Sequence, residues 1–265
     1  MLLFAASATW ARSATKVAGG TSASSSSSSS ATPTTTAPTT ASGAAVTGGA
    51  TSETPAAGGA QPQKRHAAPI TARTSSLVYK GPIYEKTATG QIVPYVAPPP
   101  AGTARGATGG SYADLAADAK PELLVPGVTA RYVKGLAAAP MSAPEDVQQI
   151  IWAGNQLIGL PYIYGGGHAS FVSPGYDCSG SVSFALHGAD LIAAPMDSSE
   201  FMGWGEHGVG QWVTIFSNPE HAYMTVAGLR LDTSPADDPS DREGPRWRPL
   251  RPENAGFVKR HPIDL

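Results

Sequence analysis

The sequence predicts an α+β domain in the second half of the chain, with helices first and a small antiparallel sheet after them. Apolar residues recur at helical spacing between residues 145 and 186, and period-two alternation replaces that spacing after residue 190. Helices followed by strands are typical of an α+β fold. The first 60 residues, by contrast, carry only three charged side chains among Ser, Thr, Ala and Gly. They cannot bury enough apolar surface to offset the entropy of ordering them.

By composition the chain divides into four segments. Residues 1–20 are a candidate signal segment, although their apolar stretch has no basic region before it and is too short to span a bilayer. Residues 21–110 are a Ser/Thr/Ala/Pro/Gly-rich linker that we expect to be disordered. Residues 111–140 are a pre-domain segment, and residues 141–265 are the folded domain. Stalks of this composition commonly tether extracellular enzymes, so we expect export and no transmembrane span.

Charge is unevenly divided along the chain. Residues 1–140 hold 11 Lys/Arg against 5 Asp/Glu, whereas residues 141–265 hold 7 against 15, so the net charge of −2 combines a basic first half with an acidic domain. Nucleic-acid binding needs clustered Lys and Arg, and the acidic domain therefore predicts no nucleic-acid partner. We interpret the basic half as a soluble linker; the alternative is weak association with anionic surfaces.

The first helix is predicted to begin near Pro144 and to end at Gly159. Ser142 and Glu145 have the spacing of a capping box, and proline fits the first turn of a helix. Apolar residues follow at helical spacing, and glycine commonly terminates a helix. Gly154 falls on the apolar face, where the missing side chain would let a neighbouring element approach closely.

A turn-rich connector leads to a second predicted helix, from Cys178 to Leu186, and to four strands after it. These strands are 212–216, 222–226, 229–233 and 256–261. Ala227-Gly228 lies between the second and the third, so these two strands are predicted to form a tight hairpin. Before the domain, residues 92–96 also alternate, and either pack on the domain or form no regular structure.

The tryptophans of the domain are assigned by their local patterns. Trp152 lies in the first predicted helix and Trp212 begins the first predicted strand, so we expect both in the core. Trp204 stands between two glycines in a loop, and we expect it to line a groove.

Cys178 is the only cysteine of the chain, which excludes an internal disulfide and a zinc site of several thiolates. A lone cysteine is often a small buried apolar residue. Here, however, Asp177 can cap the second helix, so that Cys178 falls at the helix N-terminus, where N–H groups and the helix dipole stabilise a thiolate. The thiolate is the attacking species in thiol catalysis. The pattern therefore favours Cys178 as a nucleophile.

His221 is the histidine best placed to act as the base for this thiol. It opens an alternating strand, which would present its ring at a sheet edge beside the second helix. His187 ends the same helix as Cys178, roughly 13 Å along it, and cannot reach the sulfur. His168 lies on the loop before Cys178, where it is either a substrate contact or a solvated side chain.

Asp232 is the candidate for orienting the imidazole of His221. A two-residue turn sets Tyr223 opposite Asp232, which makes Asp232 the diagonal neighbour of His221. A shift of one residue would give that place to Thr233, but only a carboxylate would also stabilise an imidazolium. The other alternative is that Asp232 merely shapes the end of its strand.

Three motifs together resemble the NlpC family of cell-wall cysteine endopeptidases. They are Pro161-Tyr162-Ile163-Tyr164-Gly165-Gly166, Asp177-Cys178-Ser179-Gly180 and the strand that opens with His221. The resemblance covers about residues 143–235. It implies a papain-like fold, in which the helix that bears the cysteine packs against a small sheet that carries the histidine.

Position by position, the resemblance implies that Cys178 is the nucleophile and His221 the base. Tyr162 matches a tyrosine that helps form the oxyanion or substrate-amine site, and Asp177 matches a residue that contacts the free amine of a stem peptide. The implied substrates are stem peptides of bacterial peptidoglycan, cleaved without a metal or a cofactor. We therefore expect a monomer that is secreted or associated with the cell wall.

The sequence departs from the family pattern at two points. Gly210-Gln211-Trp212-Val213 stands where Pro-Gly-Asp-Leu is usual, and the third residue, commonly His, Asn or Gln, is Asp232 or Thr233 here. These departures leave the predicted nucleophile and base intact and bear on the substrate class instead. The alternatives are an amidase or acyltransferase of the same fold and a catalytically silent wall-binding protein, against which the combination of Cys178, His221 and Tyr162 argues.

Overall fold

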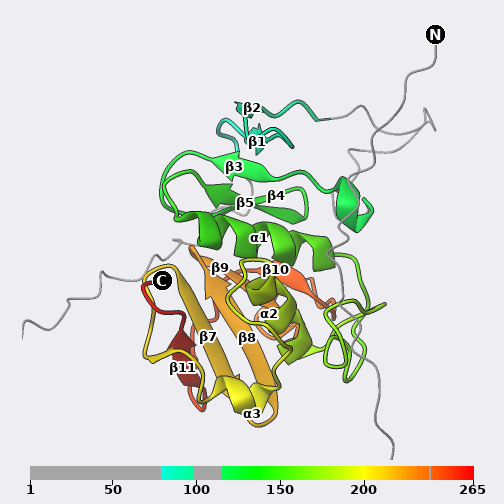
Figure 1. Cartoon of the computed structure of the whole chain (residues 1–265), viewed down its shortest axis with the longest axis vertical. Helices are drawn as coiled ribbons and strands as arrows, with labels where there is room; N and C mark the ends of the chain where they lie inside the picture. The colour runs from blue at the N-terminus through cyan, green and yellow to red at the C-terminus, as the bar shows by residue number, and fades with distance from the viewer. Residues whose placement is uncertain (1–78, 98–114, 239) are drawn as a thin grey trace, which may run out of the picture. The chain divides into compact units, whose positions relative to one another are not determined.

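The computed structural model describes residues 79–97, 115–238 and 240–265. The candidate signal segment and most of the expected linker lie outside these ranges. The described chain is a mixed α/β structure with two β-sheets and few helices (Figure 1). None of the helices in the described segments is long and apolar enough to cross a membrane.

The first sheet precedes the predicted domain boundary at residue 141. Its five short strands run in the order β2-β1-β3-β5-β4, with β3 and β5 parallel and the other pairs antiparallel. The strands are β1 (Tyr84–Lys86), β2 (Ile92–Pro94), β3 (Leu123–Val125), β4 (Arg131–Val133) and β5 (Leu136–Pro140). A 3₁₀ turn, η2 (Ala117–Ala119), precedes β3.

This sheet corrects the expectation that the packed part of the chain begins at residue 141. β3 and β5 are fully buried and share one hydrophobic core with the helices. No strand was predicted at β5 because it reads Leu-Ala-Ala-Ala-Pro, and alanine is depleted in strands. Residues 92–96, which the sequence left open, contribute β2.

Helix α1 (Glu145–Leu157) lies between the first sheet and the second helix, α2 (Cys178–His187), and contacts β5 and α2 (Figure 1). The predicted capping box does not form, because the helix begins at Glu145 and its N-cap is Pro144, which has no side-chain donor or acceptor. Glu145 instead binds Lys86 Nζ of β1 at 3.0 Å. A capping box does form at the short helix α3 (Ser198–Phe201), between Asp197 and Glu200.

The close approach predicted at Gly154 is confirmed. A Cβ at this position would lie 2.7 Å from the indole of Trp247, which packs directly on the helix backbone. Trp247 Nε1 also donates to Asn155 Oδ1 at 2.8 Å, and the amide of Asn155 exchanges two 2.9 Å hydrogen bonds with the main chain of Ala137. One buried asparagine thus joins β5, α1 and the second sheet. Trp152 is buried as expected.

The second sheet has six antiparallel strands in the order β10-β9-β8-β7-β11-β6. Four of them confirm the predicted strands. The bounds are β6 (Glu206–His207), β7 (Val213–Asn218), β8 (His221–Val226), β9 (Leu229–Asp232), β10 (Arg246–Arg248) and β11 (Val258–His261). Helix α2 contacts β8 and β9 and covers the face that carries Ala222, Met224 and Val226.

The hairpin of β8 and β9 has the predicted register. Ala227 and Gly228 both have positive φ, of 46° and 92°, which is the backbone of the tight turn that matches the twist of two strands. Val226 consequently pairs with Leu229. His221 and Tyr223 alternate with the core-facing residues of β8 and lie on the opposite face of the sheet.

Candidate active site

Asp177 caps helix α2, as predicted, and holds the preceding loop against it. Its carboxylate accepts hydrogen bonds from the main-chain N–H groups of Gly180 (2.8 Å) and Gly165 (3.0 Å). His168 Nε2 lies 3.0 Å from the same carboxylate. Asp177 is only 6% exposed, and its carboxylate fixes the loop and the helix start; its contact with a substrate amine stays a prediction.

Cys178 is the first residue of α2, where the helix N-terminus favours a thiolate. Burial alone would raise the pKa of the Cys178 thiol. The hydrogen bonds of the sulfur with His221 and with the main chain of Ala222, together with the charge of His221, outweigh that burial and lower the pKa below its ordinary value. The site therefore stabilises the reactive ionic form of the sulfur.

His221 stands at the start of β8, at the end of a tight turn from β7. Asn218 shapes this turn, because its side-chain oxygen accepts from the main-chain N–H groups of Glu220 (3.0 Å) and His221 (2.8 Å). Burial alone would lower the pKa of His221. The hydrogen bonds to Asp232 and Cys178 raise it to about 9. Both shifts favour the ionic form of the pair, a thiolate beside an imidazolium.

Asp232 occupies the position predicted for the orienting residue. Its Oδ1 lies 2.9 Å from His221 Nε2, which leaves Nδ1 of the ring for the sulfur of Cys178. The shifted register that would have brought Thr233 to this place does not occur. Cys178 comes from α2, and His221 and Asp232 come from the hairpin of β8 and β9, so a helix and a hairpin that are distant in sequence meet at one point.

Tyr162 lies on the loop that Asp177 holds. The loop joins the chain before α2 through a bridge between Tyr162 and Tyr176. Partial burial raises the pKa of the Tyr162 hydroxyl, and the negative charges of Cys178 and Asp177 raise it further. Tyr162 is 41% exposed and lies close enough to Cys178 to feel its charge, so it offers a face to a ligand.

Two glycines make this close packing of loop and helix feasible. A Cβ on Gly180 would collide with the carbonyl oxygen of Gly166, and a Cβ on Gly166 would collide with the carbonyl oxygen of Gly175. The same Gly166 oxygen accepts from the main-chain N–H of Asp177 at 3.2 Å. The glycines of the Gly-Gly and Ser-Gly pairs therefore allow the backbones of the loop and the helix to pack in direct contact.

The other histidines of the domain have separate surroundings. The ring of His187 stacks on Phe171 at 3.8 Å between centroids, and His168 contacts Ser179 as well as Asp177. His207 and His261 lie where β6 and β11 meet: His207 is in register with Arg260, and His261 with Glu206. His221 is the one that the structure brings to Cys178.

The sequence interpretation missed Arg230. This side chain is fully buried, and its Nη1 donates to Asp232 Oδ2 at 3.0 Å. A signal was present in the alternation Leu229-Arg230-Leu231-Asp232, because residues two apart on a strand share a face. Two opposite charges on one face of an apolar strand indicate a buried ion pair.

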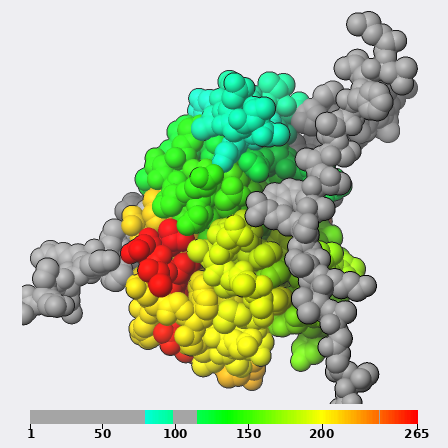
Figure 2. Space-filling view, viewed as in Figure 1, coloured from blue at the N-terminus to red at the C-terminus, as the bar shows by residue number. Residues whose placement is uncertain are grey.

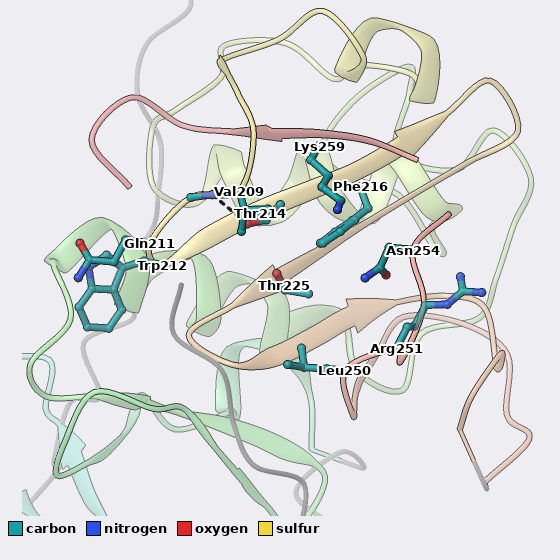
Figure 3. Close-up of a pocket in the computed structure, with 11 residues that line it drawn as sticks. Val209, Gln211, Trp212, Thr214, Phe216, Thr225, Leu250, Arg251, Asn254 and Lys259 are labelled. Atoms are coloured by element: carbon teal, nitrogen blue, oxygen red, sulfur yellow. Dashed lines mark hydrogen bonds between the residues drawn. The ribbon is translucent and has the colours of Figure 1, made fainter. Parts of the chain in front are cut away.

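A cavity of about 280 Å³ lies on the same face of the second sheet, next to the site (Figure 3). Trp212, Thr214 and Lys259 are among its lining residues, and Cys178, His221 and Asp232 are not. Tyr223 separates cavity and site: its ring stacks on Phe216 of the cavity at 4.8 Å, and lies 6.0 Å from the His221 ring.

Trp212 and Trp204 are both half-buried and pack against the core. Trp212, expected in the core, also lines the cavity, because β7 begins one residue later and Trp212 belongs to the preceding loop. Trp204, expected in a groove, packs edge-on against the buried ring of Phe201 at 6.1 Å. Glycines on both sides of a residue indicated a loop but not the direction of its side chain.

Comparison of the chain with models of known protein families gives no match, and comparison with curated proteins gives none either. The chemical interpretation of the site therefore depends on its geometry and on the three sequence motifs.

Proposed function

We propose that this protein is a cysteine-type hydrolase that cleaves peptide bonds in the stem peptides of bacterial peptidoglycan. The observation that carries the proposal is the connected set formed by Cys178, His221 and Asp232. A thiol of lowered pKa at a helix N-terminus, joined to an imidazole that a carboxylate orients, is the arrangement of nucleophilic catalysis.

The reaction follows from the ionic state of the pair. The thiolate of Cys178 attacks the carbonyl carbon of the scissile bond and forms a C–S bond, while the imidazolium of His221 gives its proton to the leaving amine as the C–N bond breaks. His221, now neutral, takes a proton from water, and the resulting hydroxide attacks the thioester. Release of the carboxylate regenerates the thiolate and the imidazolium.

Negative charge develops on the carbonyl oxygen in both steps. The main-chain N–H of Cys178, at the start of α2, and the hydroxyl of Tyr162 are the donors that we assign to it. The hydroxyl can serve as a donor because its raised pKa keeps it protonated at neutral pH. Asp232 holds the His221 ring in the orientation that both proton transfers need.

The substrate class is supported by the motifs. The Tyr-x-x-Gly-Gly and Asp-Cys-Ser-Gly motifs form two sides of the same site, and this pairing supports a papain-like domain of the NlpC type. The tract of Ser, Thr, Ala and Pro in the first 62 residues supports a protein that is secreted or associated with the cell wall.

The experiment is incubation of purified muropeptides with the protein, followed by mass spectrometry of the products. We expect cleavage within the stem peptide, loss of cleavage in Cys178→Ala and His221→Ala, and wild-type cleavage in His207→Ala, which removes an exposed histidine outside the site. Cleavage that survives in Cys178→Ala, or intact stem peptides with the wild-type protein, would contradict the proposal. Loss of the sugar–peptide linkage instead would indicate an amidase.

A further inference from the structure

Arg230 is buried directly beside the pair formed by Asp232 and His221. It lies two residues before Asp232 on β9, so the two side chains share a face of the strand. Nη1 donates to Asp232 Oδ2 at 3.0 Å, and Nη2 donates to the carbonyl oxygen of Ala236 at 2.6 Å. The guanidinium thereby ties the carboxylate to the loop that follows β9.

The carboxylate of Asp232 is consequently held at both oxygens. Oδ1 accepts from His221 Nε2 and from the main-chain N–H of Ser234, each at 2.9 Å, while Oδ2 accepts from Arg230. Without the guanidinium, Oδ2 would be a buried acceptor lacking its charged donor, which is costly. Rotation of the carboxylate toward other donors would relieve that cost and would weaken its bond to His221.

Burial of Arg230 costs the folded state free energy. Arg230 has no exposed side-chain surface, and burial of a guanidinium is expensive even when a carboxylate compensates it. Nε of Arg230 has no hydrogen-bond partner among the residues that the structure describes. Its neighbours in sequence, Leu229 and Leu231, are apolar. Local violations of this kind are typical of functional sites.

We propose that Arg230 is a positioning residue: by fixing the carboxylate of Asp232 it aligns the imidazole of His221 with the sulfur of Cys178. The inference rests on the proposed function, because alignment matters for chemistry only if His221 works with Cys178. Arginine suits the task, since its planar fork binds two oxygen acceptors in a set geometry and stays charged. A lysine could not reach Asp232 and Ala236 at once.

A purely electrostatic role for Arg230 predicts the opposite result from a positioning role. Removal of a positive charge alone would raise the pKa of His221, whereas loss of the oriented carboxylate would lower it, because the bond to Asp232 raises that pKa. Substitution of Arg230 leaves the other titratable and charged groups around His221 and Asp232 unaltered. These groups are Cys178 of α2, Tyr223 of β8, Arg248 of β10, Arg251 and Asp237.

The test is an NMR titration of the His221 ring in full-length protein with labelled histidine, assigned by His221→Gln. In Arg230→Met we expect the pKa of His221 to fall by about one unit or more from its value of about 9. Arg248→Met is the matched control: it removes an equally buried arginine, whose Nε binds the main-chain oxygen of Asp232 at 3.0 Å and not its carboxylate. We expect the pKa of His221 not to fall in this control, because loss of a positive charge alone can only raise it.

An unchanged or raised pKa in Arg230→Met would overturn the inference. If Arg230→Met does not fold, Arg230→Lys replaces it in the titration. We expect the pKa of His221 in Arg230→Lys to lie below the wild-type value, and a pKa equal to that of wild type would overturn the inference. In the muropeptide assay, kcat should fall about tenfold in Arg230→Met with little change in KM. The titration needs no substrate, so it can fail or succeed independently of the proposed function, which Cys178→Ala tests.

Discussion

The carboxylate of Asp232 binds one nitrogen of the His221 ring, at 2.9 Å between Oδ1 and Nε2, and so leaves Nδ1 for the sulfur of Cys178. This contact fixes which ring nitrogen meets the sulfur, and it raises the pKa of the imidazole. The strand pairing behind it is set by the Ala227-Gly228 turn. A local feature of two residues therefore decides the geometry of the candidate site.

Replacement of Asp232 is expected to lower turnover strongly. Asp232→Asn keeps the shape of the side chain but removes the charge that stabilises the imidazolium, and we expect kcat to fall by about 10²-fold or more. Thr233→Ala, on the next residue, should retain turnover within about twofold. Steady-state cleavage of muropeptides measures both variants, and equal effects of the two substitutions would be inconsistent with Asp232 as the orienting residue.

The pH dependence of activity follows from the two pKa directions. The active form needs the thiolate of Cys178 and the proton of His221, and it exists between the two pKa values of the coupled pair. The lowered pKa of Cys178 sets the acid limb below the ordinary range of a thiol, and activity should fall again as pH rises through about 9, where His221 loses its proton. A kcat/KM profile that keeps rising above pH 9 would show that the imidazolium is not required.

Gly180→Ala tests the contact between α2 and the Tyr162 loop. The added methyl group would collide with the carbonyl oxygen of Gly166, so the loop must shift. We expect a loss of about 1–3 kcal/mol in the free energy of unfolding and slower reaction of Cys178. Gly203→Ala is the control, because its Cβ would meet no atom closer than 3.8 Å. Urea denaturation and thiol alkylation measure the two effects, and wild-type behaviour of Gly180→Ala would contradict the packing described.

Asn155→Ala tests the link between the first sheet and the rest of the fold. The substitution removes the partner of both main-chain groups of Ala137 and of the Trp247 indole, all of them buried. We expect the free energy of unfolding to decrease by about 2–4 kcal/mol. Gln156→Ala, next to it on the exposed side of α1, should be nearly neutral. Similar stability of the two variants would show that this asparagine does not join the sheets.

The second half of the fold could be predicted because its signals are local. Asp177 before Cys178 indicates a helix start, and Ala227-Gly228 between alternating residues indicates a hairpin with a definite register. From that register the contact of His221 with Asp232 follows by counting residues. The same reasoning fails where tertiary packing overrides local preference, as in the alanine-rich strand β5.

The burial and the hydrogen-bond partners of Arg230 and Asp177 could not be predicted from sequence spacing. The sequence predicts a helix cap at Asp177, and the family resemblance implies a substrate contact there; the positions of Gly165 and His168 show that its oxygens are already hydrogen-bonded. Arg230 was visible in the sequence as a charge on an alternating strand, but the depth of its burial depends on the segment after β9. Burial and partner choice are properties of the assembled fold.

The most direct test of the account is the rate of alkylation of Cys178 by iodoacetamide as a function of pH. The chain has one cysteine, so intact-mass spectrometry follows this site alone. The account predicts that Cys178 already reacts faster than free cysteine at pH 6–7, and that His221→Ala removes this advantage, because the thiolate is the reacting form. A rate that rises only near the ordinary thiol pKa of about 8.5, equal in wild type and His221→Ala, would contradict the thiolate–imidazolium pair.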